Sequence, residues 1–168
     1  GRDKLMLRPL EASQTNGKLY QIFGSFDVRT LAGATSVVGD RLSWSLKDMQ
    51  ETLATMPEGC TYFGEGDTKS GMLQQIMGMN LDRYVNWETG ECSFNSPDFI
   101  SALEFCNSFP LEFDWSKVDY EDRTDEATMI QTGMQMLVSV YLSDLQYMQY
   151  YRYIFGGDFS LSLIHISE

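Results

Sequence analysis

The chain has 168 residues, 43% of them hydrophobic and 21% charged, which is the composition of a folded domain of ordinary size and argues against disorder. Twelve Lys and Arg residues against 24 Asp and Glu give a net charge of −12, and the basic residues are scattered singly. This pattern disfavours nucleic acid and an anionic membrane surface as partners. With His165 as the only histidine, we expect no Ser-His-Asp or Cys-His catalysis and no His-based metal site. The three cysteines have no CxxC spacing, which argues against structural zinc.

Short extended pieces and helices alternate along the first half of the chain. The expected elements are, in order, a short helix (4–13), a turn at TNGK (15–18), extended chain (19–23 and 25–31), small residues up to Gly39, and a helix (46–56). Ser45 is expected to cap that helix, whose apolar face holds Leu46, Met49, Leu53 and Met56. No apolar stretch reaches the length of about 18 residues that a membrane-spanning helix requires.

The second half continues the α/β pattern. The expected elements are a short apolar run (61–63), a loop (64–67), a helix (69–81), a turn between two extended pieces (85–87 and 92–94), a helix (97–109), an acidic helix (120–132), a strand (134–141) and an aromatic helix (143–155). Ser96 followed by Pro97 is typical of a helix start, and Phe99, Leu103, Cys106 and Phe109 are its expected buried face.

The last nine residues, SLSLIHISE (160–168), differ in character from the rest of the chain. They resemble a translated sequencing adapter, so we treat residues 160–168 as an artefactual tail outside the fold. The alternative is a C-terminal strand, because Leu161, Leu163, Ile164 and Ile166 are apolar. We also expect the chain, which opens without Met, to be a piece of a longer protein.

Three patterns that could carry chemistry fit poorly. The acidic stretch 119–126 lacks the Gly and Glu of a calcium loop, because Thr124 and Ile130 occupy those positions, and is read as the start of a helix. The GEGDTKSG stretch (64–71) has Thr68 where a phosphate loop needs Gly, and is read as a loop before a helix that starts at Thr68. Paired carboxylates for glycoside hydrolysis are available, but nothing in the sequence singles out two of them.

Aromatic residues are in excess, at 13% of the chain. Most are expected in the core, but the aromatics between Tyr141 and Phe155 are too many for one buried stripe, so some must be partly exposed. Exposed aromatic faces suit the apolar faces of sugar rings.

Four motifs in order resemble the extracellular solute-binding proteins of ABC importers, the broad family (type 1) that includes the sugar binders. They are GKLYQIF (17–23), WSLKDM (44–49), VNWETGECSF (85–94) leading to SPDF (96–99), and GMQML (133–137). The similarity covers residues 5–158, although Phe23 stands where the family has proline and the stretch 119–126 has no counterpart.

The resemblance implies an α/β fold of the type II periplasmic-binding-protein kind, with two lobes joined by crossing strands and ligand held between them. Residues 1–33 would be the end of the first lobe and the first crossing strand, 34–132 part of the second lobe, and 133–159 the return crossing strand and the helix after it. Hinge closure around the solute needs no catalytic group and no cofactor.

The resemblance also implies a ligand and a location. The positions beside the crossings, Phe23, Ser25, Phe26, Tyr62 and Tyr141, are the expected ligand-binding residues, through aromatic stacking and hydroxyl hydrogen bonds to a sugar or oligosaccharide. The expected partner protein is the importer's permease, and the expected place is the cell surface, through a lipid anchor outside this piece. Two other functions stay open: a carbohydrate-active hydrolase that uses two carboxylates, and a non-catalytic surface or adhesive domain.

Overall fold

The computed structural model describes residues 7–22, 25, 27–41, 43–121, 123–144 and 146–164. In these ranges the elements are α1 (Leu7–Ala12), β1 (Val28–Ala34), α2 (Thr35–Val38), β2 (Ser43–Trp44), α3 (Leu46–Leu53), the 3-10 turn η2 (Gly64–Gly66), α4 (Lys69–Tyr84), α5 (Pro97–Asn107), the 3-10 turn η3 (Trp115–Lys117), α6 (Glu126–Gln131), β3 (Leu137–Leu142), α7 (Gln146–Phe155) and β4 (Phe159–Ile164). The expected α/β class is confirmed at this level.

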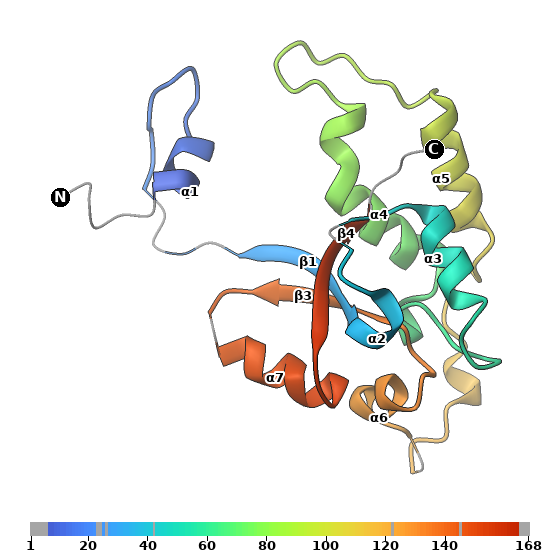
Figure 1. Cartoon of the computed structure of the whole chain (residues 1–168). Helices are drawn as coiled ribbons and strands as arrows, with labels where there is room; N and C mark the ends of the chain where they lie inside the picture. The colour runs from blue at the N-terminus through green and yellow to red at the C-terminus, as the bar shows by residue number, and fades with distance from the viewer. Residues whose placement is uncertain are drawn as a thin grey trace.

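One small mixed sheet organises the body, in the strand order β2-β4-β1-β3 (Figure 1). β1 pairs antiparallel with β3, from Val28 opposite Leu142 to Gly33 opposite Leu137. On its other side β1 pairs antiparallel with β4, and the two-residue β2 joins β4 in parallel. The two segments expected to cross between lobes, ending in β1 and β3, therefore lie side by side and run in opposite directions.

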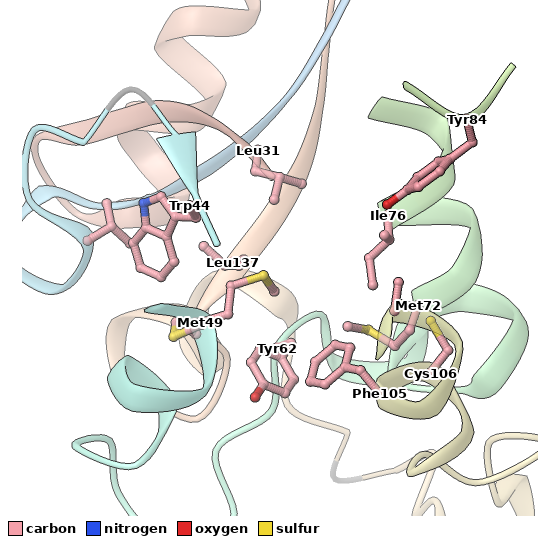
Figure 2. Packing of buried hydrophobic residues seen from close by; sticks show 13 residues of the cluster. Leu31, Trp44, Met49, Tyr62, Met72, Ile76, Tyr84, Phe105, Cys106 and Leu137 are labelled. Carbon is pink, nitrogen blue, oxygen red and sulfur yellow. The ribbon is translucent and has the colours of Figure 1, made fainter. Parts of the chain in front are cut away.

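Each face of the sheet packs against its own layer of helices because side chains alternate along a strand. Leu31 and Leu137 point into a core shared with α3, α4 and α5, which includes Met49, Met72 and Ile76 (Figure 2). On the opposite face, smaller β-sheet side chains pack against α6 and α7; they are Ala32, Val138 and Val140. The body is thus three layers, helix on sheet on helix.

Three of the helix starts read from the sequence are confirmed. Ser45 caps α3 in a capping box, in which its hydroxyl accepts from the Asp48 backbone N–H and the Asp48 carboxylate accepts from the Ser45 N–H. The Thr68 hydroxyl caps α4 and the Ser96 hydroxyl caps α5, which has Pro97 in its first turn.

Two predictions about helices are wrong. The acidic helix begins at Glu126 instead of residue 120, because the Asp125 carboxylate accepts a 2.9 Å bond from the Thr128 N–H and so caps the helix there. In α5 Leu103 is 40% exposed, since the helix turns Ala102, Phe105 and Cys106 towards the core instead. The expected burial of Phe99, Cys106 and Phe109 is confirmed, with Phe99 and Phe109 partly buried.

The N-terminal segment lies apart from the three-layer body (Figure 1). The expected turn at 15–18 is confirmed: Asn16 and Gly17 have positive φ angles of 52° and 71°, and Thr15 and Lys18 bond to each other. Residues 19–22 form no strand and are exposed.

The C-terminal segment contributes to the sheet as far as the structure describes it. Ser160–Ser162 pair with Leu31–Gly33 of β1, and the Thr30 hydroxyl donates a 2.6 Å bond to the Ser162 carbonyl. A C-terminal strand, the alternative to a tail outside the fold, is therefore observed up to residue 164, while the adapter-like origin of 160–168 stays a prediction. His165 lies outside the described residues. Among the described residues, no helix has the length and apolar character needed to cross a bilayer.

Candidate functional site

A tight turn after residues 61–63 shapes one wall of the candidate site. The Asp67 carboxylate accepts 2.7 Å hydrogen bonds from the backbone N–H groups of Tyr62 and Phe63. Burial raises the pKa of Asp67, against the opposing effect of these two N–H donors. The Thr61 hydroxyl also accepts from the Gly64 N–H, so the turn η2 is fixed at both ends.

The buried side-chain amide of Gln135 forms the second wall of the candidate site. Gln135 is 6% exposed and lies between α6 and β3, bridged in parallel to Thr61. Its Nε2 donates to the Glu126 carboxylate at 3.1 Å and to the Leu137 carbonyl at 3.0 Å. Both amide hydrogens are thereby used, and the side-chain oxygen Oε1 faces Gly64, where an added Cβ would come within 2.7 Å of it.

Between these walls lies a cavity of about 500 Å³. Its lining combines apolar groups from the 113–118 segment, the turn and α6 with polar groups, and includes Phe63, Phe113, Val118, Met129, Thr124 and Gln135. A concave site with apolar walls and few polar groups is the usual form of a small-molecule site. We call it the Gln135 cavity.

An ion pair joins opposite sides of this cavity. Arg123 binds the carboxylate of Glu65, and both residues line the cavity. The Arg123 guanidinium also lies 6.0 Å from the centre of the Trp115 ring, which packs edge-on against Phe113. The pair therefore ties the irregular 113–124 segment to the turn η2.

Exposed tyrosines lie on β3 and on α7. Tyr141 is 48% exposed, and Arg29, its cross-strand partner, lies 5.1 Å from the ring centre. Tyr147 and Tyr150 on α7 are exposed near the buried Tyr151, which packs on the face of the sheet opposite to the Tyr141 side chain.

Tyr151 packs between α7 and β3. Burial raises the pKa of its hydroxyl; the backbone of Tyr141 bonds to it, and the charge of Glu126 acts on it. Glu126 also lines the Gln135 cavity.

The structure separates the residues predicted from the sequence. Tyr141 is exposed on the face of the sheet that carries Leu137, and Ser25 is exposed, whereas Phe23 and Phe26 lie outside the described residues. The Tyr62 ring is 5% exposed and packs in the core, 5.9 Å from the centre of the Phe105 ring (Figure 2). Its burial raises the pKa of its hydroxyl to about 12. The turn that Tyr62 introduces reaches the cavity, but its ring does not line it.

Sequence reasoning missed Gln135, Glu126, Glu65, Arg123 and Phe113 as candidate site residues. The sequence marks a loop at 64–67 and an acidic stretch at 119–126, but no local signal indicates that they face each other. In the part of the chain that the structure describes, no group of three His, Cys, Asp or Glu side chains could hold a metal ion. In comparisons with family models, curated proteins and solved structures, no match to this chain was found.

Proposed function

We propose that the chain binds a small solute, a sugar or oligosaccharide, and supplies one lobe of a type II solute-binding protein that delivers it to an ABC importer. The observation that carries this proposal is the Gln135 cavity, where apolar walls stand beside an amide and carboxylates. Such walls suit the C–H faces of a sugar ring, and the polar groups suit its hydroxyls.

The strand arrangement supports the two-lobe part of the proposal. β1 and β3 lie antiparallel in one sheet, as strands that leave and re-enter a lobe would. The segment before β1 departs from the body, which leaves the three-layer body as the second lobe (Figure 1). On this proposal the permease is the partner protein and the cell surface, by way of a lipid anchor, is the location.

The experiment is a ligand screen on the 168-residue chain. Thermal unfolding is followed with mono- and oligosaccharides, amino acids and short peptides, since a ligand that binds the folded state raises Tm by mass action. The variant Phe113→Ala removes a cavity wall, and Tyr153→Ala removes an exposed aromatic side chain that does not line the cavity. We expect a sugar to raise Tm, and we expect this rise to be smaller in Phe113→Ala and unchanged in Tyr153→Ala. If no sugar raises the Tm of the parent chain, the proposal is contradicted.

A second candidate function has its own observation. Glu65 and Glu126 line the same cavity, as the two carboxylates of a glycoside hydrolase would. Release of reducing sugar from an oligosaccharide, abolished by Glu65→Gln or Glu126→Gln, would establish the hydrolase. The binding protein leaves the sugar intact.

A further inference from the structure

We propose that the Gln135 cavity takes a solute with a protonated amine, such as an amino sugar, and that the Glu126 carboxylate receives the ammonium group. This inference rests on the proposed function and names the class of its ligand. It depends on which groups at the cavity are already paired and which are not.

The two carboxylates of the cavity differ in their partners. Glu65 is neutralised by Arg123. Glu126 takes one bond from the Gln135 amide at its Oε1, and no Lys or Arg of the described residues lies within ion-pair distance of it. One carboxylate at the cavity thus keeps an oxygen and a full charge free for a ligand.

The Gln135 amide beside Glu126 also offers an acceptor. Gln135 has spent both amide hydrogens on Glu126 and Leu137, so its Oε1 is left to accept. An ammonium group has three donors and no acceptor, which matches this set better than a hydroxyl does. Phe63 and Phe113 also line the cavity, and the face of an aromatic ring attracts a cation.

The surrounding charge favours the same ligand. Asp119, Glu121 and Asp125 belong to the segment that leads to Glu126, and Arg123, already paired with Glu65, is its one described cation among residues 119–126. A cationic ligand would be attracted to this region, and an anionic one repelled.

The test compares three probes of nearly the same shape: glucosamine, its neutral N-acetyl derivative, and glucose. Dissociation constants are measured by calorimetry on the full chain at about pH 6, where an amine of this kind is mostly protonated. A charge-assisted hydrogen bond predicts that glucosamine binds about tenfold more tightly than glucose, and that added salt reduces the difference.

Two variants assign this preference to Glu126. Glu126→Gln keeps an oxygen for the Gln135 amide and removes the charge, so we expect it to bind glucosamine and glucose equally. Glu121→Gln makes the same change of net charge in the same segment but outside the cavity lining, and should keep the preference. Because Glu126 is exposed, the variant should melt like the parent chain.

The outcomes separate the two proposals. If glucose and glucosamine bind equally to the parent chain, or if Glu126→Gln keeps the preference, the ammonium site is refuted while solute binding stands. If no probe or other sugar binds, both proposals fail.

Discussion

Gly71 lies in the first turn of α4, where a side chain has no room. A Cβ there would come within 2.2 Å of the Gly66 carbonyl oxygen and 3.0 Å of the Thr68 hydroxyl. The carbonyl cannot move away freely, because it accepts a 2.8 Å bond from the Thr68 N–H. Overpacking of this kind costs about 1–3 kcal/mol. We therefore expect Gly71→Ala to lower the free energy of unfolding by about 2 kcal/mol and Tm by about 4–8 °C.

Gly78 supplies the matched control, because it lies in the same helix with no atom within 4 Å of an added Cβ. There Gly→Ala should stabilise by about 0.5–1 kcal/mol through helix propensity alone. Both variants are measured by urea unfolding followed by circular dichroism. If Gly71→Ala proves as stable as the parent chain, or if both variants shift stability in the same direction, the reasoning from the contact at Gly66 is refuted.

Three further predictions concern the core and the caps. Ser45→Ala should lower the free energy of unfolding by about 1 kcal/mol at neutral pH. The Ser45 hydroxyl holds the pKa of Asp48 below its usual range, so the stability that this bond to the ionised carboxylate provides is lost as pH falls through the lowered pKa. In urea titrations the difference in unfolding free energy between parent and variant should therefore become smaller below about pH 4. Ile76→Ala removes a side chain with no exposure and should lower the free energy of unfolding by about 2–5 kcal/mol, whereas Leu103→Ala, at an exposed side chain, should lower it clearly less. Equal losses of stability would contradict the assigned core. In a pH titration, the phenolate absorbance of the parent chain should exceed that of Tyr62→Phe only near pH 12, because burial raises the pKa of the Tyr62 hydroxyl. A difference in absorbance between the two chains already near pH 10 would show that this hydroxyl is not buried.

Local signals in the sequence were enough to place the starts of α3, α4 and α5. Ser45, Thr68 and Ser96 each bond to a backbone N–H three residues ahead, an interaction that needs no other part of the chain. The start of α6 was misplaced because several acidic residues in a row suit a first helical turn, and only the geometry at Asp125 selects one of them. Leu103 was misplaced because α5 is apolar on more than one side, so that packing decides which side is buried.

The candidate site was less accessible to sequence reasoning because it joins segments far apart in the chain. Arg123 meets Glu65 across 58 positions, and nothing near either residue indicates the other. Tyr62 shows a further limit of sequence reasoning, since the turn that follows it lines the Gln135 cavity while its own ring belongs to the core. That some of the aromatics between Tyr141 and Phe155 are exposed followed from their number, although which of them are exposed did not.

The position of β4 between β1 and β2 has a consequence for how the chain folds. The bond from Thr30 to Ser162 spans 132 positions, so the sheet cannot be completed until the last segment arrives between strands made much earlier. Contacts this distant are slow to form, and we expect refolding in milliseconds to seconds instead of microseconds. Until β4 docks, β1 is paired with β3 along one edge and its other edge is open. We expect the chain to be most prone to pairing with other chains in this state.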